Sequence, residues 1–341
     1  MERVALAPLT TLKLGGPAAR MVEARTEGEL AEAVRSAYEP LLVLAGGSNV
    51  VIADEGFPGT VVRVLTRGVE RDGARLTVQA GEPWEALVAA CVAAGLQGFE
   101  CLAGIPGSTG ATPIQNVGAY GQEVAETVES VRVLDRASGR IEDLPAAACG
   151  FSYRSSVFKY RDRRVVLAVS FRLREGGASG PLRYAELARR LGVPVGASAP
   201  LAAVREAVLE LRRAKGMVID PADPDPDAVS AGSFFTNPIL APEAFAALAA
   251  RTGPDLRPPA FPEPDGRIKT SAAWLIERTG FPRGYGGGRV GISTKHTLAL
   301  VNRGGGTTAE LLALAREIAG RVHERFGVAL RPEPVLVGHE W

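Results

Sequence analysis

Hydrophobic and polar positions in the first half of the chain alternate between the spacing of helices and that of short strands. Residues 26–38 have helical spacing, and Thr26 followed by Glu29 predicts a capping box at the start of that helix. Residues 83–96 are apolar on nearly every side, which predicts a packed helix with Pro83 in its first turn. Aliphatic and β-branched runs predict strands at 41–45, 50–53, 60–65, 74–81, 128–135 and 163–174.

The pattern changes near residue 175. Residues 174–183 have the composition of a loop, and 199–216 are spaced as a long amphipathic helix with basic residues at its end. The proline-spaced acidic segment 221–227 is expected to contain no helix. Further helices are predicted at 242–252, 271–280 and 307–327, and strands at 297–303 and 334–338.

Length and charge narrow the class of protein. A chain of 341 residues is expected to form two or three domains. With 39 basic and 38 acidic residues its net charge is +1, so we expect no nucleic-acid partner and no attraction to anionic membranes. The longest uncharged stretch, 101–122, is too polar to insert into a membrane. The first ten residues lack the apolar core of a signal peptide, which predicts a cytoplasmic protein.

The cysteines and histidines point to neither a disulfide framework nor a metal site. Three cysteines occur without a CxxC pair, as is typical of a reducing compartment. The three histidines lie beyond residue 295 and have no metal-ligand spacing. We therefore predict that no metal is bound.

Two glycine-rich segments are the strongest candidates for chemistry. In 44–54, a strand, the turn Gly46-Gly47-Ser48-Asn49 and a second strand follow one another, which is either an anion-binding nest or an ordinary β-turn. Residues 104–121 hold five glycines and almost no bulky apolar residue between structured flanks, so this segment is functional or disordered. It matches neither a Walker A loop nor the dinucleotide motif GxGxxG. Its composition fits a loop whose backbone N–H groups cradle a pyrophosphate.

Together these turns resemble the FAD-binding domain of the vanillyl-alcohol-oxidase (PCMH) type. The chain resembles in particular the UDP-N-acetylenolpyruvoylglucosamine reductase (MurB) family, in its longer type I branch. The resemblance covers nearly the whole chain and rests on ordered motifs at 10–18, 44–59, 104–121, 149–159, 231–238, 269–281, 291–302 and 330–338. It implies an α+β fold with an FAD-binding region at 1–175, a connecting segment with a substrate loop and helix at 176–215, and a substrate-binding domain at 216–330. The strand near 334–338 is expected to pack back on the first region.

The resemblance implies NADPH-dependent reduction of UDP-N-acetylglucosamine enolpyruvate to UDP-N-acetylmuramate through FAD, in peptidoglycan precursor synthesis. Such a reaction builds negative charge beside a carboxylate and needs a proton donor at the new carbanion. By motif, Ser233 matches the proton donor, Arg154 the arginine that binds the substrate carboxylate, and Glu333 the glutamate that stabilises the intermediate. Taken alone, the same residues read as a turn serine, a surface ion-pair arginine and an exposed acid.

Further site residues follow from the same motifs. Those implied for FAD are Gly46, Gly47, Ser48, Asn49, Gly104, Ile105, Pro106, Gly107, Ser108, Gly110, Ala111, Gln115, Asn116, Gly118 and Ala119. Those implied for the substrate are Tyr120, Tyr153, Tyr184, Lys215, Asn237, Arg283 and His296, although Tyr153 and Tyr184 are equally consistent with half-buried packing.

The chain departs from the family pattern at Ala111 in the second turn, at Thr236 where relatives often carry lysine, and at Pro334 after the glutamate. The position of every histidine beyond residue 295, and of every cysteine outside the two glycine turns, predicts FAD that is not covalently attached. A monomer is expected. The alternatives are an oxidase or dehydrogenase of the same fold, which would not require the motif around Ser233, and a nucleotide-binding protein that has lost catalysis, which would not require Arg154 or Glu333.

Overall fold

The computed structural model describes residues 4–253 and 256–341, which fall into two compact units. The first unit contains residues 18–47 and 57–219, and the second contains residues 5–17, 48–56 and 220–341. The division differs from the linear boundaries predicted above, because two short N-terminal segments belong with the C-terminal part of the chain. Residues 176–215, expected to connect two domains, cluster with the first unit.

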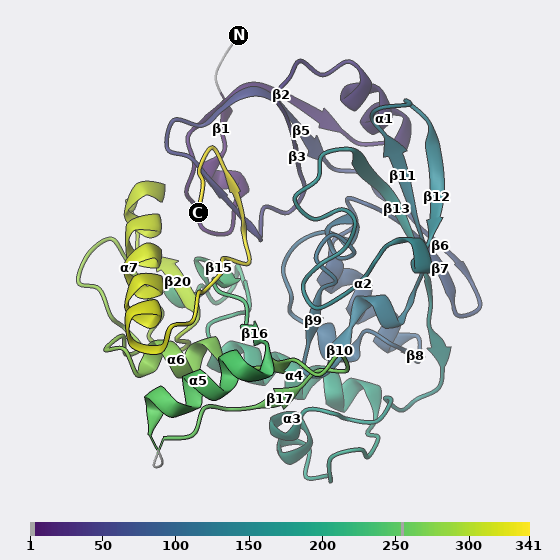
Figure 1. The fold of residues 1–341 in the computed structure, drawn as a ribbon. Helices are drawn as coiled ribbons and strands as arrows, with labels where there is room; N and C mark the ends of the chain where they lie inside the picture. The colour runs from purple at the N-terminus through teal and green to yellow at the C-terminus, as the bar shows by residue number, and fades with distance from the viewer. Residues whose placement is uncertain (1–3, 254–255) are drawn as a thin grey trace. The chain divides into compact units, whose positions relative to one another are not determined.

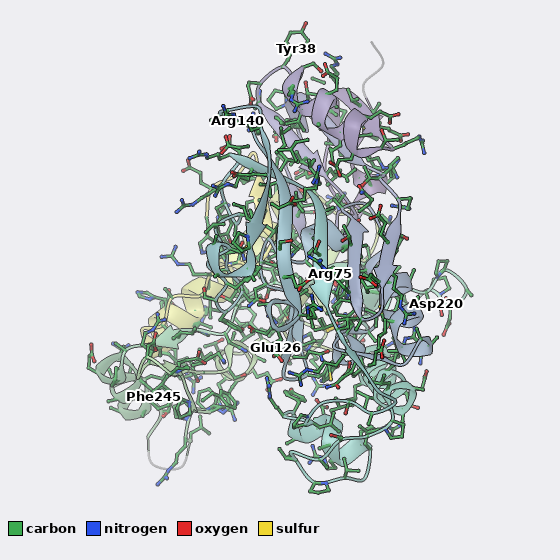
Figure 2. The ribbon with its side chains drawn as sticks, turned by 90° about the vertical axis from the view of Figure 1, so that its right-hand side faces the viewer. Tyr38, Arg75, Glu126, Arg140, Asp220 and Phe245 are labelled. Atoms are coloured by element: carbon green, nitrogen blue, oxygen red, sulfur yellow. The ribbon has the colours of Figure 1, made fainter. Side chains whose placement is uncertain are left out.

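The first unit contains an antiparallel five-stranded sheet, in the order β12-β11-β13-β7-β6 (Figure 1). Alternating valines such as Val131 and Val169 bury one face of this sheet. The other face carries ion pairs, including Arg75 (labelled in Figure 2) with Glu129 at 2.7 Å. The strands are β6 (Val69–Asp72), β7 (Arg75–Gln79), β11 (Val128–Asp135), β12 (Ile141–Pro145) and β13 (Arg164–Arg172).

A second sheet of the first unit is parallel. In it β5 pairs with β2 on one side and with β3 on the other. Its strands are β2 (Pro17–Ala24), β3 (Leu41–Leu44) and β5 (Phe57–Val64), preceded in the chain by β1 (Val4–Ala5). Short strands in this part of the chain are β8 (Leu96–Gln97), β9 (Gly118–Ala119), β10 (Gln122–Glu123) and β14 (Arg174–Glu175).

The helices of the first unit are α1 (Glu27–Arg35), α2 (Trp84–Ala93), α3 (Ala185–Arg190) and α4 (Leu201–Ala214). The Thr26 hydroxyl accepts from the Glu29 N–H at 3.2 Å, as a helix cap requires. The predicted capping box is wrong, because the Glu29 carboxylate accepts instead from the N–H of Arg25, at 2.8 Å. The aromatic centre of the core is formed by Trp84, Phe99 and Phe171, whose ring centroids lie 4.8 to 6.2 Å apart.

The second unit is built on an antiparallel sheet in the order β15-β20-β19 and on the long helix α7 (Thr308–Phe326), drawn in yellow in Figure 1. A capping box of Thr307 and Glu310 begins α7, and Gly327 ends it with a φ of 70°. The other elements are β4 (Val50–Ile52), β15 (Ser230–Ser233), β16 (Ile239–Leu240), α5 (Pro242–Thr252), β17 (Phe261–Pro262), β18 (Ile268–Lys269), α6 (Ala272–Glu277), β19 (Val290–Ile292), β20 (Ala299–Asn302) and β21 (Val335–Val337).

Two details of the second unit bear on the sequence-based expectations. Strand β21 pairs in parallel with β4, so the last strand of the chain lies beside residues 50–52. In the acidic segment 221–227, predicted to contain no helix, a 3-10 turn begins at Pro226 and ends at Ala228. Proline is tolerated in the first turn of a helix, and the side chain of Asp225 caps this turn by accepting from the N–H of Asp227.

Candidate active site

Within the first unit, Gly46 of the first glycine turn lies against Gly107 of the second. A Cβ atom added to Gly46 would stand 2.6 Å from the Cα of Gly107, well inside van der Waals contact. Gly47 and Gly107 have φ values of 61° and 120°, which residues with a Cβ rarely adopt. Turns that are more than fifty residues apart in sequence therefore meet backbone to backbone, with no side chain between them. Any residue with a Cβ at position 46 would therefore push the two turns apart.

The second turn is held in one conformation by the main chain. The N–H groups of Thr109 and Gly110 donate to the carbonyls of Glu82 and Ala80, both at 2.8 Å. A Cβ on Gly110 would lie 2.5 Å from the Cβ of Ala80. Thr109 is fully buried. Of the two readings that the sequence left open for this segment, these bonds favour an ordered loop.

Two residues that the motifs did not indicate anchor the start of this loop. The carboxylate of Glu85, in the first turn of α2, accepts a hydrogen bond from the N–H of Gly104 and forms an ion pair with Arg205 of α4. Glu85 thus connects the loop to two helices. A single glutamate in a helical pattern carries no sequence signal for such a role.

Asn116 connects the glycine loop to the segment that carries Arg154. Its side-chain NH2 donates to the Glu123 carboxylate at 2.7 Å and to the carbonyl of Ser152 at 3.1 Å, while its oxygen accepts from the Ala125 N–H. The buried Asn116 amide is thus engaged in positioning the protein's own segments.

Arg154 stands at the tip of a tight turn. Ser152 and Ser155 exchange two main-chain hydrogen bonds of 3.1 Å, so Arg154 lies between paired residues with a φ of 53°. Its guanidinium donates to the carbonyl of Gly118 at 2.6 Å and lies 5.2 Å from the ring centroid of Tyr153. Three of the sequence-predicted site residues, Arg154, Tyr153 and Gly118, therefore meet here.

A second group of predicted residues meets in the same unit. The rings of Tyr120 and Tyr184 pack edge to face with centroids 5.4 Å apart, and Lys215 Nζ lies 5.5 Å from the Tyr120 centroid. Lys215 also donates to the carboxylate of Glu186 at 2.8 Å, a partner that the motifs did not indicate. Burial lowers the pKa of Lys215, but the hydrogen bond and the charge of Glu186 outweigh it, so the pKa of Lys215 is raised. The pKa of Tyr120 is raised by burial.

Arg212 adds a buried cation to this group. Its Nη2 donates to the carbonyl of Met217 at 2.9 Å, whereas its buried Nε has no hydrogen-bond partner in the described part of the chain. A Cβ on Gly104 would lie 3.1 Å from that Nε, so Arg212 borders the start of the glycine loop. Burial lowers the pKa of Arg212. A buried and incompletely paired guanidinium favours a negative charge placed against it.

In the second unit, Ser233 is the last residue of β15 and is paired with Ala299 of β20. Gly232, with a φ of 74°, turns the strand just before Ser233, and the N–H of Phe234 donates to the carbonyl of Leu298 at 2.7 Å. These contacts place the Ser233 hydroxyl 3.3 Å from Nε2 of His296. Two predicted site residues from separate motifs are therefore neighbours.

Glu333 lies on a segment that runs beside the residues after Ser233. Its N–H donates to the carbonyl of Phe234 at 2.8 Å, and Thr236 donates to the carbonyl of Arg331 at 3.1 Å. Asn49 of the first glycine turn reaches the same segment, because its amide donates to the carbonyl of Glu333 at 3.4 Å and its own carbonyl accepts from Val335. Asn49 and Glu333 are thus brought together by the pairing of β4 with β21.

The remaining predicted residues have less direct placements. The oxygen of Asn237 accepts from the N–H of Ala272, at the start of α6, and Arg283 donates to the carbonyl of Lys295 at 3.4 Å. Ser108 forms an isolated bridge with Pro83. Ala111 lies in a 3-10 turn and Ala119 lies in β9. The half-buried residues of the second glycine loop include Ile105, Pro106 and Gln115, and Ser48 lies in the first glycine turn.

The three cysteines are buried in the first unit, which bears on how a flavin is held. Burial raises the pKa of Cys91 and Cys101 to about 12 and that of Cys149 to about 11. Such thiols are protonated at neutral pH and are poor nucleophiles.

In residues 4–253 and 256–341, no three His, Cys, Asp or Glu side chains group as a metal site would require. In the same ranges, no helix has the length and apolar character to cross a bilayer.

Comparison with known proteins assigns the family. Residues 18–145 match the FAD binding domain, and residues 224–337 match the C-terminal domain of UDP-N-acetylenolpyruvoylglucosamine reductase. The protein of that name from Thermobifida fusca is 58% identical over 99% of this chain and 98% of its own, and that from Streptomyces coelicolor is 58% identical over 98% and 89%. The chain belongs to the UDP-N-acetylenolpyruvoylglucosamine reductase family.

Structure comparison agrees with this assignment. The crystal structure of the Thermus caldophilus UDP-N-acetylenolpyruvylglucosamine reductase (MurB) superimposes with a TM-score of 0.68 at 27% identity, over 98% of both chains. The reductase-family fold, with its FAD-binding and C-terminal domains, confirms the predicted α+β fold class, oxidoreductase activity and FAD cofactor. The close-packed glycine turns around Gly46 and Gly107 lie within the matched FAD-binding range, and they fit this cofactor.

Proposed function

We propose that this chain reduces UDP-N-acetylglucosamine enolpyruvate to UDP-N-acetylmuramate, with NADPH as the source of hydride. The observation that carries the proposal is the placement of Ser233 and Glu333 within one unit. Main-chain bonds at Phe234 and Thr236 hold the two residues on neighbouring segments. An oxidase or dehydrogenase of the same fold would have no use for a proton donor in this place.

FAD, when bound, supplies the hydride-transfer chemistry. The glycine turns around Gly46 and Gly107 are assigned to hold its pyrophosphate, since their close approach excludes side chains and successive glycine-rich backbone can form an anion-binding nest. The protonated, buried cysteines favour binding without a covalent bond to the protein. Arg212, beside Gly104, is assigned to favour negative charge at the start of the same loop.

The protein side of the reaction is assigned to three residues. A guanidinium binds a carboxylate in two parallel hydrogen bonds, so Arg154 is suited to grip the enolpyruvyl carboxylate while charge builds on the adjacent carbon. Ser233 gives its hydroxyl proton to that carbon. Glu333 is assigned to stabilise the same intermediate by hydrogen bonding.

The nucleotide end of the substrate is assigned to the group around Lys215. Tyr120, Tyr184 and Lys215 offer two hydroxyl groups and one ammonium, which suit a diphosphate. Because Glu186 holds Lys215 Nζ at 2.8 Å, the diphosphate would compete with this carboxylate for the ammonium. Tyr153, Asn237 and Arg283 are further assigned to the substrate. We also propose that the protein acts in the cytoplasm as a monomer, with no nucleic-acid partner.

Separate measurement of the two half-reactions tests the role of Ser233. Reduction of the bound flavin by NADPH creates no carbanion, so Ser233→Ala should leave that rate unchanged. Reoxidation by the enolpyruvyl nucleotide should slow by roughly 10²–10⁴, the effect typical of losing a general acid. Anaerobic rapid mixing at the flavin absorption band follows each step.

Two further variants serve as controls. Ser233→Cys keeps a donor of similar size and should retain more activity than alanine. Ser198→Ala removes an exposed serine of the first unit and should change neither half-reaction. Equal slowing of both half-reactions in Ser233→Ala would show that Ser233 only supports the structure.

A further inference from the structure

A serine that donates a proton leaves a problem which the assigned residues do not solve. The ordinary pKa of a serine hydroxyl lies far above neutrality, so the alkoxide left on Ser233 is a strong base that must be reprotonated for the next turnover. A neighbouring group that can carry a proton would supply it directly. Histidine is the side chain best suited to this task near neutral pH.

His296 is the neighbour that the structure provides. Its Nε2 lies 3.3 Å from Ser233 Oγ, and both residues are half-buried. The ring can therefore exchange protons with solvent while touching the serine. The two residues are 63 positions apart in the sequence and meet because β15 pairs with β20.

The turn that carries His296 is fixed from within. The Ser293 hydroxyl accepts from the N–H groups of Lys295 and His296, at 3.0 and 3.1 Å, and the carbonyl of His296 accepts from the N–H of Ala299. Ala299 is the residue paired with Ser233. The main chain of the histidine is thus tied to the strand position opposite the serine.

Two carboxylates fix the same turn from outside. Asp227 accepts from the N–H and the hydroxyl of Thr294 at 2.8 and 2.6 Å, and Glu277 accepts from the hydroxyl of Thr297 at 2.6 Å. The residues on either side of Lys295 and His296 are therefore immobilised. A turn anchored at this many points holds a side chain at a defined distance from its partner, as a proton-transfer pair requires.

We propose that His296 is the proton relay that serves Ser233. The Ser233 O–H bond breaks as the C–H bond to the substrate carbon forms. The Nε2–H bond of a His296 imidazolium then breaks as the O–H bond of Ser233 is restored, which leaves a neutral imidazole, and solvent returns the proton to that imidazole. No electrons are gained or lost in this relay. The inference rests on the proposed role of Ser233, and it replaces the substrate-binding role that the family resemblance implied for His296.

The test compares His296→Ala and His296→Gln in the FAD-loaded enzyme by rapid mixing. Flavin reduction by NADPH and the dissociation constant of the enolpyruvyl nucleotide should stay within twofold of wild type. Reoxidation should slow by about tenfold or more in both variants, because glutamine can accept a hydrogen bond but cannot deliver a proton. Added imidazole should restore part of the rate to His296→Ala. His323→Ala, which removes an exposed histidine of α7, is the matched control and should behave as wild type.

Each other outcome overturns the relay. A raised dissociation constant with normal reoxidation at saturation would return His296 to substrate binding. A wild-type rate in His296→Gln would reduce it to a hydrogen-bonding support, and that variant also decides the matter should His296→Ala fail to fold. Slow reoxidation that imidazole does not improve would indicate a structural defect. If Ser233→Ala slows reoxidation while the His296 variants do not, the relay fails and the proposed function stands. If Ser233→Ala has no selective effect, the donor assignment itself fails.

Discussion

Gly46→Ala tests whether the two glycine turns form the flavin cradle. The new Cβ would lie 2.6 Å from the Cα and 3.1 Å from the carbonyl carbon of Gly107. Carbon atoms in contact normally lie about 3.5–4.0 Å apart, so the overlap is close to 1 Å. Both obstructing atoms belong to the main chain and cannot rotate away. The turns must separate.

The size of the effect follows from this forced separation. Extra methyl groups in a well-packed region cost about 1–3 kcal/mol. If FAD requires the turns at their present distance, this cost appears in binding, and the dissociation constant for FAD should rise roughly 5- to 150-fold. The φ of Gly46 is not positive, so the clash and not backbone strain is the cause.

Titration of the apoprotein with FAD, followed by flavin fluorescence, measures this change. Gly28→Ala is the matched control, because it lies in α1 and an added Cβ meets nothing within 4 Å. The control should bind FAD normally and gain about 0.5–1 kcal/mol of stability, since alanine favours a helix. Unchanged FAD affinity in Gly46→Ala, with only a lower melting temperature, would refute the cradle.

Three further predictions concern other parts of the chain. Tyr184→Phe should raise the KM for the nucleotide substrate roughly 10- to 100-fold without loss of flavin, as expected for a hydrogen bond to a charged group, whereas the exposed control Tyr38→Phe should not. Thiol titration at pH 8 should find the three cysteines slow to react in the native protein and fully reactive after unfolding; rapid native reaction would contradict their burial and raised pKa. Burial acts to raise the pKa of Asp227, but hydrogen bonds from Thr294 and Ser293 hold that pKa below its ordinary value. The ionised Asp227 therefore stabilises the folded protein fully above an ordinary carboxyl pKa of about 4, and this stabilisation is lost as the pH falls through the lower pKa of the folded state. In urea unfolding, Asp227→Asn should therefore cost about 1–3 kcal/mol at pH 7 and less in acid, and an equal cost at both pH values would refute this.

Helices whose ends are marked by specific residues have boundaries close to the predicted ones. Helix α7 was predicted at 307–327, and the structure places it at Thr308–Phe326, where Thr307 and Glu310 form a capping box at its start and Gly327 ends it. The capping box that was predicted at Thr26 and Glu29 has the wrong partner for the Glu29 carboxylate, because a carboxylate can reach more than one N–H group near a helix start. Strands β2 and β12 were not predicted. Both mix charged residues with small or exposed ones, so their pairing depends on neighbouring strands and not on a local pattern.

The residues of the candidate site likewise fall into those that the sequence indicates and those that only the fold brings into place. Glycine turns and motif residues are visible in the sequence, because special backbone geometry demands glycine and specific chemistry demands specific side chains. Glu85, Glu186 and Arg212 were missed, since each is an ordinary charged residue in a helical pattern and gains its role only from a tertiary contact. The contact of His296 with Ser233 likewise depends on the pairing of β15 with β20, which no local pattern specifies.

Backbone conformation gives support for the first-unit site that is independent of any motif. Among the described residues, five that are not glycine have positive φ, and three of these are Asn116, Tyr120 and Arg154. Such conformations are uncommon for residues with a Cβ, they cost of order 1–3 kcal/mol each, and they persist where surrounding contacts impose them. The contacts are present for Asn116 in its three side-chain hydrogen bonds, and for Arg154 in the paired serines on either side of it. Strain of this kind gathers at functional sites, so its concentration between residues 116 and 154 indicates that the chain gives up stability there in order to aim side chains. From the sequence, a position with positive φ is readily predicted only where the residue is glycine.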